Sequence, residues 1–270
     1  MHHKLKKIYL IISLSSLAAC NSGTNNSPTA SNSTSTSYNT TATETKASIK
    51  VMTTGQKTTY APRDDGELQP GGEIDGVRFV SGTGAEVDCI IDKTTGFMWP
   101  KNGKLFAKTS WEDNLNKINA MNSDSANAEY NLCGHQDWRM PNANELETLV
   151  NYAESSNAAW LEAQGFQNVE RKDLYWSSTS YNLDGFCAHD MAYATSLDSG
   201  VTGGRNKSKV GAPTAENYFQ YAIPVRTADK NAPYQVPATG QTKVIRQVSA
   251  RCDGGINYTS PTGSDGDLQQ

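Results

Sequence analysis

The chain has 270 residues and is acidic, with 24 Lys and Arg residues against 28 Asp and Glu residues and a net charge of −4. This balance argues against unspecific binding to nucleic acid or another polyanion, because such binding needs a broad basic surface. The length allows one domain of ordinary size with tails. Five tryptophans and twelve tyrosines in a mostly polar chain predict an exported, loop-rich domain with aromatic anchors in its core.

Residues 1–19 have the composition of an export signal. Three lysines come before a short apolar run, and Leu17-Ala18-Ala19-Cys20 comes after it. The run is too short to cross a bilayer, which favours a signal peptide over a membrane-spanning helix. Residues 17–20 resemble the bacterial lipobox, in which the cysteine receives lipid and becomes the new N-terminus. The alternative is an ordinary signal that is cleaved nearby.

Lipidation of Cys20 predicts membrane lipid as a partner, because each buried methylene contributes about 0.8 kcal/mol to anchoring. Removing residues 1–19 removes three lysines and changes the net charge from −4 to −7. Asn21 follows the cysteine, whereas the usual sorting rule retains lipoproteins with aspartate there in the inner membrane. We therefore expect an outer-membrane anchor and a surface-exposed domain, with the periplasmic face as the alternative. Residues 20–53, rich in Ser, Thr and Asn, predict a disordered stalk, because they bury too little apolar surface to offset backbone ordering.

Two segments of the chain echo each other. Residues 54–71 read TGQKTTYAPRDDGELQPG, whereas residues 239–242 read TGQT and residues 263–269 read GSDGDLQ. The echo predicts a full domain over residues 54–228 and the start of a second, truncated copy over residues 229–270. The alternative is a pair of convergent turn sequences, since Asp-Gly favours turns.

The body between the echoes mixes helices and short strands. A helix is predicted over residues 110–121, with Ser110 as its cap and three apolar residues on one face. A second helix begins near Asn142, where Glu145 completes a capping box, and its apolar face extends to Ala153. This mixture predicts an α+β domain with a mainly antiparallel sheet. The predicted strands cover Val77–Val80, Val87–Ile91, Tyr175–Ser178, Met191–Leu197 and Tyr218–Val225.

Four cysteines remain besides Cys20. In an oxidising compartment they predict disulfides, and we favour a bridge among Cys89, Cys133 and Cys187, with Cys252 outside the main domain. The pairing stays open. The alternative is a metal site, because histidines follow Cys133 and Cys187 by two residues, but structural zinc sites have other spacings. We expect no metal and no cofactor.

A series of motifs in the body carries a family resemblance. In chain order they are Thr95-Gly96-Phe97-Met98-Trp99, Ser110-Trp111-Glu112, Cys133-Gly134-His135-Gln136-Asp137-Trp138-Arg139-Met140-Pro141-Asn142, Glu145-Leu146, Tyr175-Trp176-Ser177-Ser178 and Pro224-Val225-Arg226. Together they resemble the domain family named after the C-terminal domain of the Legionella collagen-like adhesin, over about residues 54–228. The resemblance implies a C-type-lectin-like fold with two helices and a twisted, mainly antiparallel sheet. It also implies a place on bacterial surfaces, and the founding adhesin binds sulfated glycosaminoglycans.

The signature residues are predicted to specify the fold rather than chemistry. Each tryptophan offers a large apolar area with one donor, and the charged residues beside Trp138 can tie a loop to the core. Pro141 fixes the chain before the second helix, which Glu145 caps. The full set is Trp99, Trp111, Asp137, Trp138, Arg139, Pro141, Glu145, Trp176 and Arg226.

A basic loop late in the domain supplies the candidate ligand contacts. Arg205, Lys207 and Lys209 follow two glycines in an otherwise acidic protein, and in lectin-like folds late loops are common ligand surfaces. We predict that these three residues contact an acidic glycan. The alternative is a solvated hairpin tip.

Catalysis and calcium binding are not favoured by the motifs. Ser177, Ser178, His189 and Asp190 lack a G-x-S-x-G elbow, and the adjacent His and Asp would point to opposite faces of a strand. The loop and strand motifs of a lectin calcium site are missing from the sequence. We therefore predict a non-catalytic, adhesin-like lipoprotein that binds a glycan or a host surface protein. The alternative is a structural envelope lipoprotein that acts by assembly, for example as a homo-oligomer.

Overall fold

The computed structural model describes residues 52–71, 77–181, 191–207, 218–241, 246–247, 256–257 and 262–265. The signal peptide, Cys20, most of the stalk, Cys187, His189, Lys209 and Cys252 lie outside these ranges. Within the ranges, no helix combines the length and apolar composition that crossing a bilayer requires.

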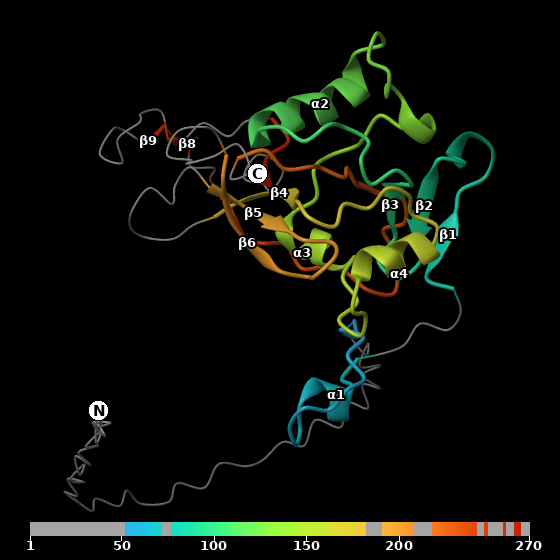
Figure 1. Ribbon diagram of the computed structural model, residues 1–270. Coiled ribbons are helices and arrows are strands. Elements are labelled where there is room, and N and C mark those ends of the chain that lie inside the picture. Colours follow the sequence, from blue (N-terminus) through green and yellow to red (C-terminus); the bar gives the residue numbers. More distant parts are fainter. Residues whose placement is uncertain are drawn as a thin grey trace, which may run out of the picture. The chain divides into compact units, whose positions relative to one another are not determined.

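The described part of the chain is an α+β fold with antiparallel sheets, which confirms the predicted fold class (Figure 1). One sheet has the order β1-β2-β3-β7, a second has the order β4-β5-β6, and β8 pairs with β9 in the tail. The strands are β1 (Phe79–Ser81), β2 (Cys89–Asp92), β3 (Phe97–Pro100), β4 (Tyr175–Ser180), β5 (Met191–Thr195), β6 (Thr202–Asn206), β7 (Arg226–Thr227), β8 (Arg246–Gln247) and β9 (Ile256–Asn257). The α-helices are α1 (Asp65–Leu68), α2 (Trp111–Ser123), α3 (Ala143–Glu147) and α4 (Asn157–Ala163), and the short 3-10 helices are η1 (Gly84–Glu86) and η2 (Leu132–Gly134).

Helix α2 begins where its capping residue predicts. The Ser110 side chain accepts a hydrogen bond from the backbone N–H of Asp113, which satisfies one of the four free donors at a helix start. The apolar stripe predicted for this helix is buried, and Met121 extends it by one turn. The helix therefore ends at Ser123, two residues later than predicted.

Helix α3 begins at the predicted capping box but is shorter than predicted. The Asn142 side chain accepts from the Glu145 N–H, and the Glu145 carboxylate accepts from the Asn142 N–H, each at 2.9 Å. The helix stops at Glu147, and Ala153 is exposed rather than part of an apolar face. The side chain of Asn157 explains the stop, because it bonds to backbone groups that follow the helix.

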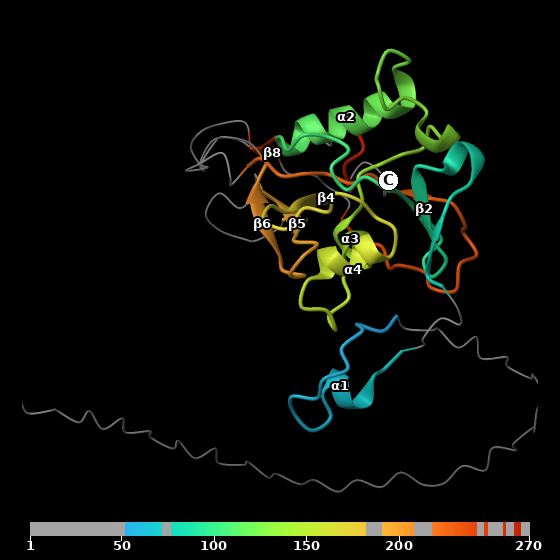
Figure 2. The ribbon, with the colours of Figure 1, turned by 45° about the vertical axis from the view of Figure 1, so that its right-hand side comes forward.

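The two sides of the strands face two separate parts of the core. Figures 1 and 2 show α2 on one side of the strands and α3 with α4 on the other. In β3, Trp99 packs in the cluster that contains α3 and α4, whereas Met98 packs with α2. In β4, Tyr175 and Trp176 divide in the same way. Both strands are buried on both faces, so neither shows a polar–apolar alternation. Strand β3 is a continuous apolar run, whereas β4 continues after its two aromatic residues with buried serines and a buried threonine.

Residues 218–225 do not form the predicted strand. Gln220 exchanges backbone bonds with Thr109, Tyr221 bonds to the two ends of the Leu174–Trp176 segment, and Val225 exchanges bonds with Arg139. The chain then enters β7 and pairs with β3. Each stretch of this segment finds a different partner, so it is extended without belonging to one ladder.

Three smaller differences from the predicted elements have local causes. The first strand starts at Phe79, because Val77 is 70% exposed and has no apolar surface to cover. Helix α4 was not predicted, although Ser156 caps it. Residues 203–206, predicted as a glycine-led loop, lie in β6, where register with β5 overrides the weak strand preference of glycine.

Candidate ligand-binding surface

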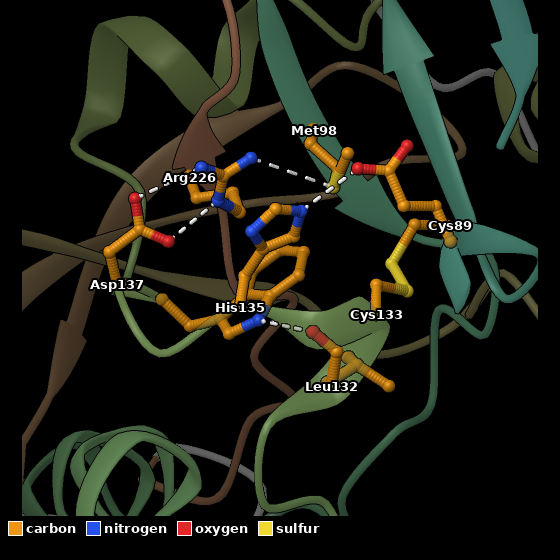
Figure 3. The surroundings of a disulfide bond; sticks show 9 residues. Cys89, Met98, Leu132, Cys133, His135, Asp137 and Arg226 are labelled. Atoms are coloured by element: carbon orange, nitrogen blue, oxygen red, sulfur yellow. Dashed lines mark hydrogen bonds and ion pairs between the residues drawn. A yellow bond between two sulfur atoms is a disulfide. The ribbon is translucent and has the colours of Figure 1, made fainter.

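A disulfide joins β2 to the loop after α2. Cys89 bonds to Cys133, and both cysteines are buried. This confirms a bridge between two of the three cysteines favoured from the sequence. Figure 3 shows the bond beside His135, whose ring Nε2 lies 2.9 Å from the Glu86 carboxylate, so the histidine faces an acid rather than a thiolate. Among the described residues, no three His, Cys, Asp or Glu side chains are placed to hold a metal ion.

The charged signature residues form two ion pairs. Arg226 donates to both carboxylate oxygens of Asp137, at 2.6 and 3.2 Å (Figure 3). The hydrogen bond from Arg226 lowers the pKa of Asp137, although partial burial opposes the shift. Arg139 donates two bonds to Glu145, at 2.5 and 2.6 Å, in the two-pronged geometry that makes arginine–carboxylate pairs strong. Both charges beside Trp138 therefore bind side chains of other elements.

The four signature tryptophans are buried, as predicted. The indole N–H groups of Trp111, Trp138 and Trp176 donate to backbone oxygens at 2.8, 3.1 and 3.2 Å. The Trp99 N–H is buried without a partner among the described residues. The signature residues therefore lie in the core or in the two ion pairs. Among them, only the half-exposed Asp137 is placed where it could contact a ligand at an open surface.

Another ion pair lies close to the start of β4. Lys104 Nζ lies 2.5 Å from the Glu170 carboxylate, which also accepts from two backbone N–H groups. Burial would raise the pKa of Glu170, but the Lys104 bond and the backbone donors prevail and lower it to about 2. The Tyr175 hydroxyl accepts from the Glu170 N–H, and burial raises the pKa of that hydroxyl.

The outer face of the β4-β5-β6 sheet carries two tyrosines. In β5 the exposure alternates, so that Met191 and Tyr193 face outward while Ala192 and Ala194 are buried. Tyr181, directly after β4, packs edge-on against Tyr193 with 4.8 Å between ring centroids. We call Tyr181, Met191, Tyr193 and Gly204 the tyrosine face.

Gly204 shapes this tyrosine face. It lies opposite Tyr193 in the register, and a Cβ at this position would lie 3.0 Å from both the Met191 methyl group and the Tyr181 ring. A side chain here would push the ring away, so the glycine allows the tyrosine to lie against β6. Arg205 follows at the border of the face, half-buried, with its guanidinium donating to the Gly204 oxygen at 2.9 Å.

The predicted ligand contacts divide into three cases. Arg205 is in β6 beside the tyrosine face, and Lys209 lies outside the described residues. The prediction that Lys207 contacts a glycan is wrong, because this residue is only 4% exposed. Its ammonium donates to Ser180 Oγ at 2.6 Å and lies 4.3 Å from the centre of the Trp111 ring. This lysine stabilises the core through a hydrogen bond and a cation–π contact and is not available to an external glycan.

The comparison with known families gives one match. Residues 88–213 match the sequence model of the Lcl C-terminal domain. This segment is similar to the Lcl C-terminal domain, and we call the folded region that contains it the Lcl domain. The family is adhesin-like and is not a known enzyme family. No curated protein matches the chain.

The fold of this Lcl domain extends beyond the matched residues. Strand β1 precedes the match and pairs with β2, and β7 follows it and pairs with β3. The domain predicted from the sequence over residues 54–228 includes these strands. The region of the chain that supplies both sheets is therefore longer than the matched segment.

Other parts of the Lcl domain bear on the remaining hypotheses. Ser177 and Ser178 are buried in β4, and the Ser177 hydroxyl donates to the Tyr193 backbone oxygen, so neither hydroxyl is offered to a substrate. His189 and Asp190 lie outside the described residues. A shallow cavity of about 290 Å³ lies between residues 52–54, the end of α3 and residues 234–237.

Sequence reasoning missed the tyrosine face. The sequence motifs assign no role to Tyr181 and predict Tyr193 only as a strand residue. The alternation Met191-Ala192-Tyr193-Ala194 was a usable signal, since small residues on one face and large ones on the other indicate a strand with an outer side chain row.

Proposed function

We propose that this chain is an outer-membrane lipoprotein, anchored through Cys20, that displays an Lcl domain for binding acidic glycans on host or neighbouring cells. The observation that carries the proposal is the tyrosine face with Arg205 at its border, within a domain of an adhesin-like family. Tyrosines offer rigid, amphipathic contact area at a low cost in side-chain entropy. Arginine donates paired hydrogen bonds to carboxylate or sulfate groups.

The charge of the chain constrains how such a ligand binds. The mature chain is expected to carry a net charge of −7, which repels a polyanion at long range. Binding must therefore come from short-range contacts at the tyrosine face, with Arg205 as a local cation. We expect a weak dependence on salt, because few ion pairs form, in contrast to a protein with a broad basic surface.

Ligand binding is tested with the chain from Asn21 onward on a glycan array and a heparin column. Tyr193→Ala should weaken binding by about tenfold or more, as central aromatic contacts do, and Arg205→Ala should weaken binding to sulfated or carboxylated glycans. Tyr130→Ala and Arg171→Ala are matched controls, because both side chains are exposed elsewhere. Complete flow-through at low salt with an empty array, or equal binding by all four variants, would overturn the proposal.

Anchoring and orientation need separate measurements. Labelled palmitate should appear on the chain and disappear in a Cys20→Ala variant. Protease added to intact cells should remove the domain if it is displayed outside. Protection from protease in intact cells, with cleavage after the outer membrane is opened, would place it at the periplasmic face instead.

A further inference from the structure

Two short segments of the chain have the same local structure. We call residues 54–69 the N-terminal clasp, and residues 239–241 together with 262–265 the C-terminal clasp. Each begins with Thr-Gly-Gln and ends in a turn that leads into a helical aspartate, Asp65 in the first and Asp265 in the second. The connection between the two parts is longer in the C-terminal clasp.

The two clasps share their hydrogen bonds as well as their sequence. The Thr54 hydroxyl donates to the Asp65 carboxylate, and the Thr239 hydroxyl donates to the Asp265 carboxylate. The following glutamine returns its backbone N–H to the threonine hydroxyl in both clasps, at 3.2 and 3.3 Å. The glycine between them has φ 85° in the first and 74° in the second, in the left-handed region that favours glycine. Unrelated turns have no reason to agree in all of these respects.

The C-terminal clasp is docked on the Lcl domain at the end of β4. The Gln241 side chain accepts from the Ser180 N–H at 2.7 Å and donates to the Ser180 oxygen at 2.9 Å, as a neighbouring strand would. The Asp265 carboxylate accepts from the Thr179 hydroxyl at 2.9 Å and is 2% exposed. Asn119 of α2 donates to the Thr262 oxygen. We call Thr179 and Ser180 the clasp receptor.

The N-terminal clasp presents the same groups but contacts a different part of the domain. Its Thr54 backbone oxygen accepts from the Tyr152 N–H at 2.9 Å, and Gly55 lies directly against the Asn151 side chain. Among the described residues, the Gln56 amide bonds to the Thr58 oxygen of its own segment. Tyr60 is 81% exposed and Leu68 is 53% exposed, an unusual exposure of large apolar side chains within one short segment. The equivalent glutamine in the C-terminal clasp pairs with the β4 backbone. The N-terminal clasp thus has a docking group and apolar surface in excess of what its own fold uses.

We propose that the N-terminal clasp of one chain docks on the clasp receptor of a second copy of this chain, in place of the C-terminal clasp that occupies it. Gln56 would take the position of Gln241 on Ser180, and Asp65 that of Asp265 on Thr179. Donor and receptor are different surfaces, so each contact is head-to-tail, and the rotation between protomers decides whether the assembly closes into a ring or stays open. This association is a specific form of the alternative function given above, in which the lipoprotein acts by assembling with other copies of itself. It does not depend on the tyrosine face.

The C-terminal clasp limits this association. It is tethered to the receptor by a short connection and therefore competes at a high effective concentration, in the millimolar range for flexible tethers. Free chains should accordingly associate weakly in solution. A change that loosens the C-terminal clasp should strengthen association, provided that the N-terminal clasp is intact.

The test uses the same substitution in each clasp of the chain from Asn21 onward. Gln241→Ala should strengthen self-association by about tenfold or more in sedimentation velocity, and Gln56→Ala added to it should return association to the parent level. Gln56→Ala alone should abolish the residual association of the parent. Equal association by the parent and Gln241→Ala, or equal association by Gln241→Ala and the double variant, would overturn the proposal.

A second measurement covers a Gln241→Ala variant that fails to fold. The chain is otherwise unchanged but carries a photocrosslinking residue in place of exposed Lys57, and isotopically light and heavy forms of it are mixed. Illumination should link position 57 to the peptide that carries Thr179 and Ser180. Light–heavy products support exchange between chains. Crosslinks confined to one isotope, or none to that peptide, would refute it.

Discussion

The disulfide is expected to carry a large share of the stability of the domain. Cys89 and Cys133 are separated by 44 residues, and the chain-entropy relation for a loop of that length gives about 4 kcal/mol at 25 °C. The perturbation is Cys89→Ala with Cys133→Ala, in a chain whose other cysteines are replaced by serine to prevent exchange. Both cysteines are buried, so the two alanines also leave small voids that add to the loss.

The assay is urea unfolding of the parent and the double variant at neutral pH. With a urea dependence of about 2 kcal/mol per molar, a loss of 4 kcal/mol lowers the midpoint by about 2 M. The reduced parent is the control, because it loses the bond but keeps the sulfur atoms, and it should account for most of the shift. A midpoint shift below about 0.5 M would refute the reasoning, since the unfolded loop would then be constrained by something other than the bond.

Three further predictions concern the core and the ion pairs. Glu145→Ala should lower the free energy of unfolding by about 2–4 kcal/mol, because it removes the α3 cap and leaves the Arg139 charge without its partner. Trp138→Ala should cost about 3–5 kcal/mol in the same urea assay, whereas half-buried Trp160→Ala should cost less. The pKa of Glu170 is lowered from 4.5 to about 2 in the folded protein. The ionised Glu170 side chain therefore contributes to the free energy of unfolding above pH 4.5, and this contribution is lost as the pH falls through 2. Allowing for solvent around Lys104, this amounts to about 2 kcal/mol, and Glu170→Gln should flatten the fall in stability over that pH range.

Each of these predictions has a result that contradicts it. An unchanged midpoint for Glu145→Ala would show that the capping box and the Arg139 pair contribute no net stability. Equal losses for the two tryptophan variants would contradict the difference in their burial. A Glu170→Gln variant with the acid sensitivity of the parent would assign that sensitivity to other carboxylates.

The sequence predicts local features of this fold better than its long-range pairings. Ser110 and the Asn142–Glu145 box mark the starts of α2 and α3 correctly, because a cap acts on the backbone within four residues. The end of α3 was predicted too late, since it depends on Asn157, whose amide donates to the Leu149 oxygen and accepts from a backbone N–H. No periodicity of residues 142–153 carries that information.

The candidate surface was predictable in part. Arg205 was singled out as a cation in an acidic chain, but Lys207, two residues later, turned inward to Ser180 and Trp111. Charge alone does not reveal which side of a strand a lysine occupies. The tyrosine face depends on the pairing of β5 with β6, and Gly204 reads as a loop residue until its register with Tyr193 is known.

The segment that ends in β7 has a consequence for how the polypeptide acquires its shape. Residues 220–227 form backbone bonds with Thr109, Arg139, the Leu174–Trp176 segment and β3. Four segments that are synthesised early therefore have a bonding partner that is synthesised later. The sheet β1-β2-β3-β7, and the backbone bonds at Thr109, Arg139 and Leu174–Trp176, cannot be completed until this stretch has been synthesised. Contacts so distant in sequence slow folding. The newly made polypeptide therefore spends that interval with sheet edges open to proteases and to its neighbours.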